Sequence, residues 1–207
     1  MIEEVHIDVA SALCSLGAPR PHAMTGFFVN WFQQHFSAEA GIEAAQLRSL
    51  LWAAVDSSNL EVESITRWKP QTTGKRPAII VSRNDWKVLS LGIDNRMMGV
   101  ATKDGVQHYA AYLEGSHTMF CLYSKATEAE IISAEVYREM MQFGPRIREE
   151  LEVMRFGAVG VGKIFEVEEA TQNFAVPVTV CYALEERWRL IPQAPLLKKI
   201  KLSSWLP

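Results

Sequence analysis

The segment from Phe174 to Leu184 limits the possible folds of this chain more than any other feature. Large apolar residues occupy one set of alternate positions, and mostly small or weakly polar residues occupy the other. The two sets are Phe174, Val176, Val178, Val180, Tyr182 and Leu184, and Ala175, Pro177, Thr179, Cys181 and Ala183. A period of two predicts a strand, and two nearly apolar faces predict that both are covered. Because Pro177 cannot donate a ladder hydrogen bond, we expect a sheet edge or a bulge there.

The clearest helix signal comes before this strand. Apolar residues at spacings of three and four form one predicted stripe, made of Ile132, Val136, Met140, Phe143, Ile147 and Leu151. Thr127 followed by Glu130 has the spacing of a capping box, which would begin the helix. Pro145 removes the hydrogen bond to the Met141 carbonyl, so we expect the helix to kink or restart at Gly144 and Pro145.

An aromatic helix is predicted from Met24 to Phe36, with Thr25 as its cap. The composition of Ala38 to Ala54 also favours a helix. Strand patterns follow, and they cover Leu60 to Arg67, Pro77 to Val81, Asp85 to Ile93, Val106 to Ser124 and Ala158 to Phe165. We expect Asp85 to Ile93 to return antiparallel to Pro77 to Val81. Val106 to Ser124 fits two strands that reverse near Gly115 or one long bent strand.

This order of elements predicts an α+β fold, in which a mixed or antiparallel β-sheet packs against one long kinked helix. We expect an N-terminal helical region over residues 1–57, an α+β core domain over 58–190 and an extended C-terminal arm over 191–207. A chain of 207 residues is long enough to bury a core without a metal or a disulfide.

Composition and charge exclude several classes of protein. With 48% hydrophobic residues and a net charge of −3, the chain has no overall electrostatic signature for nucleic acid or anionic membranes. Its three distant cysteines indicate a reducing compartment rather than a disulfide framework or a zinc ribbon. Glu3, Glu4 and Asp8 stand where a secretory signal would be basic and apolar, so we expect a soluble chain without a signal peptide.

The charge is sorted along the chain. Residues 1–75 sum to −3, residues 76–125 to +2, residues 126–170 to −5 and residues 171–207 to +3. Alternating patches suit a protein that packs against copies of itself. A solvated helix face beside a basic tail is the alternative.

Two motifs suggest chemistry and neither is complete. Gly157 to Lys163 fits a P-loop as far as its lysine, but Ile164 replaces the required hydroxyl, so a glycine-bearing strand explains it better. Glu61 or Glu63 with Asp85 and Lys87 resembles the magnesium-binding core of restriction-type nucleases. Solvated charges at a strand edge are the alternative explanation.

His117 and Cys121 would share one face of a strand, yet two ligands do not make a zinc site. We therefore predict no catalytic, cofactor-binding or metal-binding residue, and no enzymatic activity. A magnesium-dependent nuclease that uses Glu61 or Glu63 with Asp85 and Lys87 is the alternative function from another class.

Between residues 60 and 195 the chain carries a series of short patterns. They are Trp68-Lys69-Pro70, Lys75 to Val81, Glu114 to His117, Glu128-Ala129-Glu130, Glu168-Glu169, Phe174 to Tyr182, and Glu186 with Trp188. This layout resembles neck and tail-terminator proteins of long-tailed bacteriophages, particularly those with contractile tails. Residues 1–57 carry no part of the resemblance.

The resemblance implies a structural virion protein that assembles in the host cytoplasm into a ring, with a hexamer expected. Such a ring sits at the head–tail junction, caps the tail tube and joins it to the connector, and it can contact the sheath. DNA passes through the lumen without specific binding, and no membrane or cofactor is involved. A tail-sheath or baseplate accessory protein is the related alternative.

A ring also makes predictions about surfaces. The sorted charges become self-complementary between copies, and part of the aromatic excess, Phe27 to Phe36 and the arm with Trp205, is assigned to subunit contacts. We expect the acidic segment 126–170 to face the lumen or a basic neighbour. Leu190 to Pro207 is expected to lie on an adjacent subunit.

Overall fold

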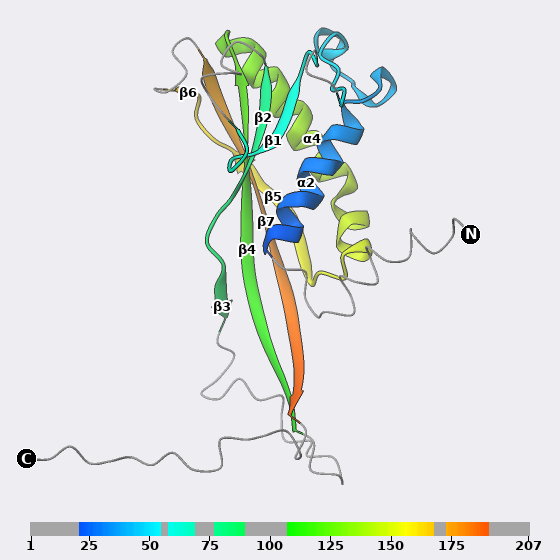
Figure 1. Cartoon of the computed structure of the whole chain (residues 1–207), viewed down its shortest axis with the longest axis vertical. Coiled ribbons are helices and arrows are strands. Elements are labelled where there is room, and N and C mark those ends of the chain that lie inside the picture. Colours follow the sequence, from blue (N-terminus) through cyan, green and yellow to red (C-terminus); the bar gives the residue numbers. More distant parts are fainter. Residues whose placement is uncertain (1–20, 55–57, 69–76, 90–106, 168–172, 191–207) are drawn as a thin grey trace, which may run out of the picture.

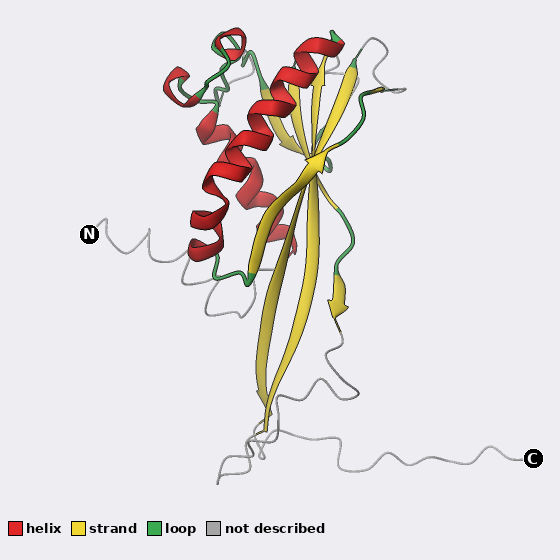
Figure 2. Cartoon of the chain, turned by 180° about the vertical axis from the view of Figure 1, so that it is seen from behind, coloured by secondary structure: helices red, strands yellow, loops and turns green. Residues whose placement is uncertain are grey.

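The computed structural model describes residues 21–54, 58–68, 77–89, 107–167 and 173–190, and at 107–110 and 187–190 it describes the backbone only. Two α-helices lie against one face of a mixed seven-stranded sheet, as the α+β prediction requires (Figures 1 and 2). The predicted arm 191–207 lies outside the described residues. No helix within the described ranges is long and apolar enough to cross a membrane.

Helix α2, Pro21–His35, confirms the predicted aromatic helix but begins three residues earlier. The prediction that Thr25 caps it is therefore wrong. Thr25 lies in the second turn, where its hydroxyl donates to the Pro21 carbonyl at 3.1 Å. Phe28 and Phe32 are fully buried on the face that meets the sheet.

Helix α4, Ala126–Glu150, confirms the long amphipathic helix. Four members of the predicted stripe are fully buried, namely Ile132, Val136, Met140 and Ile147. The capping box is wrong, because Lys125 is the N-cap residue, makes no side-chain cap bond, and leaves Thr127 inside the first turn.

Pro145 does not end α4, and the expected restart is absent, since the helix continues to Glu150. The lost hydrogen bond belongs to the carbonyl of Met141, whose side chain is 51% exposed. Because Met141 and Pro145 both lie on the exposed face of α4, water can replace the missing partner.

The helix predicted across Ala38 to Ala54 is wrong. Two short 3₁₀ helices take its place, η1 at Glu39–Gly41 and η2 at Ala45–Leu47. The segment folds back over the end of α2, since the Trp52 amide donates to the Phe36 carbonyl at 2.9 Å. This path buries the side chains of Ile42 and Leu47. A straight helix that continued away from α2 into solvent would leave them exposed.

The sheet has the strand order β1-β2-β4-β7-β5, and β3 and β6 lie off this path. The strands are β1 (Glu61–Ser64), β2 (Ala78–Arg83), β3 (Lys87–Leu89), β4 (Gln107–Tyr123), β5 (Arg155–Val161), β6 (Phe165–Glu166) and β7 (Phe174–Leu190). Only the β1–β2 pair is parallel, and the other pairs are antiparallel.

One prediction about strand pairing is wrong. β3 pairs with β4 and not with β2; residues 90–93 of the predicted return lie outside the described residues. Of the two possibilities for Val106 to Ser124, the single long strand is confirmed, because β4 runs through Gly115 as one strand of 17 residues. A Cβ at Gly115 would lie 2.7 Å from both Trp86 Nε1 and Tyr182 Cε2, so this glycine provides room for two aromatic rings.

Pro177 lies on an inner strand, yet its local surroundings match the prediction. Its carbonyl accepts a hydrogen bond from the Gly162 amide at 2.7 Å, at the point where β5 has ended and β6 has not begun. Pro177 has no N–H to donate, and on that side of β7 it faces the gap between β5 and β6, where no ladder hydrogen bond is required. A register shift between Ala158 and Gly160 adds a bulge to β5.

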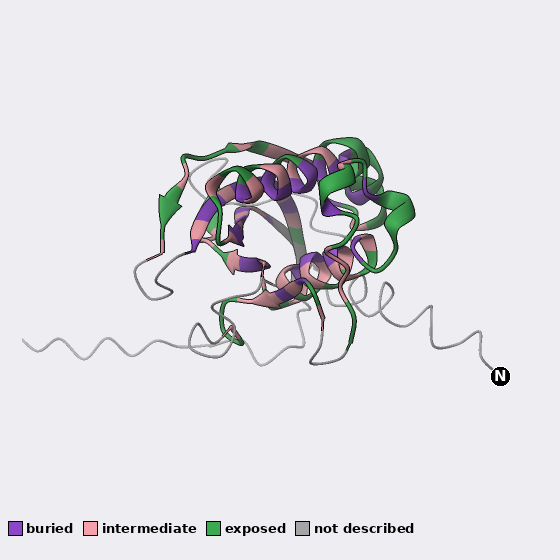
Figure 3. Ribbon diagram, turned by 90° about the horizontal axis from the view of Figure 1, so that it is seen from above, coloured by how far each residue is buried: buried purple, intermediate pink, exposed green. Residues whose placement is uncertain are grey.

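The main core lies between the helices and the sheet, and buried positions of both helices turn toward the strands (Figure 3). Phe28, Phe32 and Phe36 belong to this core at no more than 1% exposure, so the assignment of these residues to subunit contacts is wrong. On the opposite face of the sheet, Trp68, Phe120 and Val167 pack over a smaller apolar cluster. That face of β7 is only partly covered.

One part of the sheet projects beyond the helices (Figure 1). Residues 107–114 of β4 pair with residues 183–190 of β7, and we call this two-stranded part the ribbon. A strand of 17 residues is roughly 55 Å long, whereas the 25-residue α4 is about 37 Å long, so the helices cannot cover the whole strand. In the described part of the chain, β3 accompanies the ribbon at residues 112–114, and β5 reaches it at Ala183.

Candidate functional site

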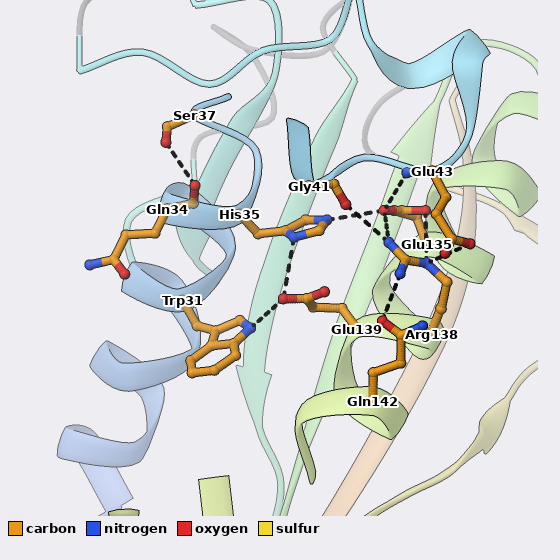
Figure 4. A network of polar contacts seen from close by, with 10 residues as sticks. All are labelled: Trp31, Gln34, His35, Ser37, Gly41, Glu43, Glu135, Arg138, Glu139 and Gln142. Atoms are coloured by element: carbon orange, nitrogen blue, oxygen red, sulfur yellow. Dashed lines mark hydrogen bonds and ion pairs between the residues drawn. The ribbon is translucent and has the colours of Figure 1, made fainter. Parts of the chain in front are cut away.

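The most polar part of the interior lies where the end of α2 meets the middle of α4 (Figure 4). We call His35, Glu135, Arg138 and Glu139, with Trp31, the His35 cluster. Glu135 and Glu139 are four residues apart, so they lie on one face of α4 and point toward α2. The side chains of His35, Glu135 and Glu139 are only 5%, 3% and 6% exposed.

Both ring nitrogens of His35 contact carboxylates. Nε2 lies 3.1 Å from Glu135 Oε1, and Nδ1 lies 3.2 Å from Glu139 Oε1. Trp31 Nε1 also donates to Glu139 Oε1 at 3.2 Å. The two carboxylates therefore lie against the two nitrogens of the His35 ring and hold it between them.

Arg138 completes the cluster on its solvent side. It donates to both oxygens of Glu135, to the Gly41 carbonyl at 3.1 Å and to Gln142 Oε1 at 2.8 Å. Burial opposes the ionisation of Glu135, but hydrogen bonds from Arg138, the Glu43 amide and His35 outweigh it and lower the pKa of Glu135. The hydrogen bond to Glu135 in turn raises the pKa of Arg138.

Most polar groups of the His35 cluster contact one another. Each ring nitrogen of His35 lies against a carboxylate, and Glu135 is bound by three donor residues. Among the residues that the structure describes, no group of three or more His, Cys, Asp or Glu residues could hold a metal ion. We therefore interpret the cluster as a clamp between α2 and α4.

A second polar chain crosses the core between α2 and the sheet. Trp86 Nε1 lies 3.1 Å from Tyr182 Oη, which lies 2.8 Å from His117 Nδ1. His117 Nε2 lies 2.9 Å from Thr25 Oγ1. His117 and Tyr182 are 0% and 1% exposed.

The order of donors along this chain follows from its two ends. Indole Nε1 can only donate and the Pro21 carbonyl can only accept. Tyr182 therefore donates to His117 Nδ1, His117 donates through Nε2 to Thr25, and Thr25 donates to Pro21. Each of these groups is satisfied with a neutral His117 whose Nε2 is protonated. This tautomer cannot take the proton of Thr25, so the pair is not a nucleophile with its base.

Burial, and then the positive charge of Arg83, lowers the pKa of His117 to about 4. The unfolded chain binds a proton at this residue below pH 6.5, and the folded chain does so only near pH 4. The neutral, buried His117 therefore contributes its full share to the free energy of unfolding above pH 6.5. This contribution is lost as the pH falls from 6.5 to about 4.

We expect this single residue to steepen acid unfolding. One pH unit is worth about 1.4 kcal/mol, so the free energy of unfolding should fall by about 2 kcal/mol between about pH 7 and about pH 5 through His117 alone. In His117→Gln, urea unfolding at the two pH values should show a correspondingly smaller difference. Equal pH dependence in both proteins would show that His117 is not held neutral.

A groove lies beside this chain, between the first half of α2 and the ends of β1 and β2. Its volume is about 570 Å³, and Thr25, the last side chain of the polar chain, forms part of its wall. Arg67 and Arg83 also line it.

The structure does not bring the nuclease-like residues together. Glu61 and Glu63 pair in register with Ala78 and Ile80 on β2. Asp85 follows Ile80 by five residues, a distance of roughly 16 Å along an extended chain. Lys87 lies on β3 opposite Glu114 of β4. These four side chains therefore do not form one cluster of ligands.

The other two motifs also have structural explanations. Gly157 to Val161 belong to β5, which is followed by β6 and not by a helix, so no helix N-terminus is present to hold phosphate. His117 and Cys121 do share the helix-facing side of β4, and both are fully buried. Burial raises the pKa of the Cys121 thiol.

Sequence reasoning missed the His35 cluster. A signal exists on α4, where Glu135 and Glu139 fall next to the buried stripe positions Val136 and Met140. Nothing local connects these glutamates with His35, because 100 residues separate His35 from Glu135.

Comparisons with known proteins add no assignment. Neither the models of known protein families nor the curated protein sequences match this chain.

Proposed function

We propose that this chain is a structural, non-enzymatic subunit that assembles into a ring at the head–tail junction of a long-tailed bacteriophage, as a tail terminator or a neck protein. The ring of six would cap the tail tube and contact the connector and the sheath, and DNA would pass through its lumen without specific binding. The observation that carries the proposal is the ribbon. The sequence resemblance adds the phage context.

An isolated two-stranded ribbon is marginally stable in water at best. Here the outer part of the ribbon projects past both helices, while its inner end, with Leu184, still belongs to the core (Figure 1). In the described part, three residues of β3 and the first residue of β5 pair with the inner end of the ribbon. Val88 and Leu89 on β3 are 60% and 40% exposed. A projecting ribbon beside exposed apolar residues of β3 is well suited to lie against a neighbouring subunit.

The interior supports a structural role as well. Both buried polar clusters are held by contacts within the chain, and they join elements that are distant in sequence. The patterns behind the resemblance fall mainly on β2, β4, β7 and the first turn of α4, which form the centre of the fold. A head-to-tail contact between identical subunits closes into a ring when its rotation allows.

The acidic residues of segment 126–170 are divided between the core and the surface. Glu135 and Glu139 turn into the chain's own core, which leaves Glu130, Glu149 and Glu152 among the exposed carboxylates. We propose that these exposed residues, rather than the whole segment, face the lumen, where like charge keeps DNA phosphates from binding.

Light scattering after size-exclusion chromatography tests the assembly. We expect the wild-type protein to have a mass several times the 23.3 kDa of one chain. Val88→Glu with Leu89→Glu should reduce it to one chain, because two charges then replace exposed apolar residues beside the ribbon. Val159→Glu is the matched control, since Val159 is 66% exposed on β5 at the far edge of the sheet. A wild-type monomer at all concentrations would contradict the proposal.

A further inference from the structure

The groove between the first half of α2 and the ends of β1 and β2 is open because α2 carries a glycine there. One stripe of α2 faces the groove, made of His22, Thr25, Gly26, Val29 and Asn30. Gly26 lies in the middle of this stripe, and a Cβ added to it would meet no atom within 4 Å. The helix therefore leaves space where a larger side chain would fill the groove. The volume of about 570 Å³ is typical of small-molecule sites.

The sheet side of the groove becomes polar where the parallel strands β1 and β2 end. Val81 of β2 is buried there and pairs in register with Ser64 of β1. Arg83 points to the same side as Val81, because side chains alternate along a strand. Arg83 also pairs in register with His117, whose Nε2 contacts Thr25 of α2. The Arg83 side chain therefore leaves the sheet on the side that faces α2.

A turn keeps a second arginine at the same end of the sheet. After β1 the amides of Arg67 and Trp68 both donate to the Ser64 carbonyl at 3.0 Å, so Arg67 stays beside the end of β1. Arg67 and Arg83 both line the groove, and both are exposed. Within the described part of the chain neither arginine forms an ion pair. Two guanidinium groups are thus available to bind an anion.

The acidic residue that lines the groove, Glu63, does not oppose such an anion. Val62 precedes it on β1 and is buried in the core between the sheet and the helices. Because side chains alternate along a strand, the Glu63 carboxylate points to the opposite face of the sheet. An anion between α2 and the sheet would therefore meet the two arginines without a carboxylate in front of it.

The groove also offers apolar surface beside the arginines. Val29 of α2 is half-buried, and Ile65, in the turn after β1, is 46% exposed. These two side chains can contact an organic group that is attached to the anion. A ligand with one charged end and one apolar end therefore fits the groove better than a bare ion.

We propose that this groove binds a small organic phosphate monoester. Its phosphate would accept hydrogen bonds from Arg67 and Arg83, and its organic group would lie against Val29 and Ile65. A monoester phosphate carries nearly two negative charges and three acceptor oxygens, so it can pair with both guanidinium groups at once. A carboxylate has only one charge and two oxygens. This proposal depends neither on the phage assignment nor on assembly into a ring.

Calorimetric titration of the full-length protein with phenyl phosphate tests the proposal. We expect a Kd below about 1 mM. Arg67→Gln and Arg83→Gln should each weaken binding about tenfold or more, the loss expected for a hydrogen bond between charged groups. Arg48→Gln, at an exposed arginine outside the groove, is the matched control and should leave the Kd unchanged.

A steric variant tests the groove without removing a charge. Gly26→Leu should abolish binding, because the new side chain would occupy the space that the glycine leaves. Leucine favours a helix more than glycine does, so the fold should be kept, and circular dichroism checks this.

Nuclear magnetic resonance locates the ligand. On saturation with phenyl phosphate the ring signals of His117 should shift, because His117 contacts Thr25 in the groove wall and pairs with Arg83. The ring signals of His35, at the other end of α2, should stay in place.

Two further probes define the class of ligand. Methyl phenyl phosphate is a diester with the single charge of a DNA backbone phosphate, and benzoate carries a carboxylate on the same ring. Both should bind about tenfold more weakly than phenyl phosphate, because each offers the arginines only one negative charge.

Three results would overturn the proposal. The first is no binding of phenyl phosphate to the wild-type protein at about 10 mM. The second is an unchanged Kd in both arginine variants while circular dichroism shows an intact fold. The third is equal binding of the diester or of benzoate, which would mean that the groove does not recognise a phosphate monoester. Ring assembly is measured separately by light scattering, so failure here and failure of the proposed function are distinguishable.

Discussion

Replacing His35 with leucine should destabilise the protein by about 1–3 kcal/mol, the cost of leaving a buried hydrogen-bonding group without its partner. The change leaves the side chains of Glu135 and Glu139 inside the core at 3% and 6% exposure. Glu135 keeps Arg138, but Glu139 keeps only the Trp31 indole among the hydrogen-bond donors described for it. Urea unfolding followed by circular dichroism measures the effect.

A double variant separates this cost from a simple loss of packing. In His35→Leu with Glu139→Leu, the poorly partnered carboxylate is gone, so the double variant should be more stable than His35→Leu alone. Ser37→Ala, at an exposed position near the end of α2, is the control and should change stability by less than about 0.5 kcal/mol. A loss below about 1 kcal/mol in His35→Leu would mean that the cluster does not hold α2 against α4.

Gly115→Ala should cost about 1–3 kcal/mol, an unusually large effect for one added methyl group. The new Cβ would lie 2.7 Å from Trp86 Nε1 and from Tyr182 Cε2, closer than real Cβ contacts. Either ring can move only by disturbing the hydrogen bond between them and the Tyr182–His117 bond. Thermal unfolding and the fluorescence of Trp86 both report on this change.

Gly157→Ala is the matched control, because Gly157 is also a strand glycine but a methyl group added there would meet no atom within 4 Å. We expect no loss of stability there, since alanine restricts the unfolded chain more than glycine does. Trp86→Leu combined with Gly115→Ala should recover part of the stability by removing the larger ring. Equal effects at the two glycines would contradict the explanation by packing.

Local periodicity predicted the elements whose burial follows one repeat. The stripe Ile132, Val136, Met140 and Ile147 predicted α4, and the alternation around Val178 predicted β7. Both patterns hold because one face of each element meets the same core. The α+β class follows from the order of these elements along the chain.

Features that depend on distant contacts were not predictable. Gly115 looked like a turn residue, yet it is a packing requirement set by Trp86 and by Tyr182 of β7. The composition of Ala38 to Ala54 favours a helix. The segment instead folds back over the end of α2, because this path buries Ile42 and Leu47. The His35 cluster forms only when α2 and α4 meet, so no local pattern could connect its members.

Phe28, Phe32 and Phe36 belong to the core of a single chain and are not free to contact another subunit. In the assembly that we propose, the exposed pair Val88 and Leu89 replaces the aromatic helix as the expected subunit contact.

Negative-stain electron microscopy of the purified full-length protein tests the central claim most directly. We predict closed rings with a central opening, with six subunits as the expected number, and loss of these rings in the Val88→Glu, Leu89→Glu variant. A field of compact single-chain particles for the wild-type protein, at concentrations where the fold is intact, would contradict the claim.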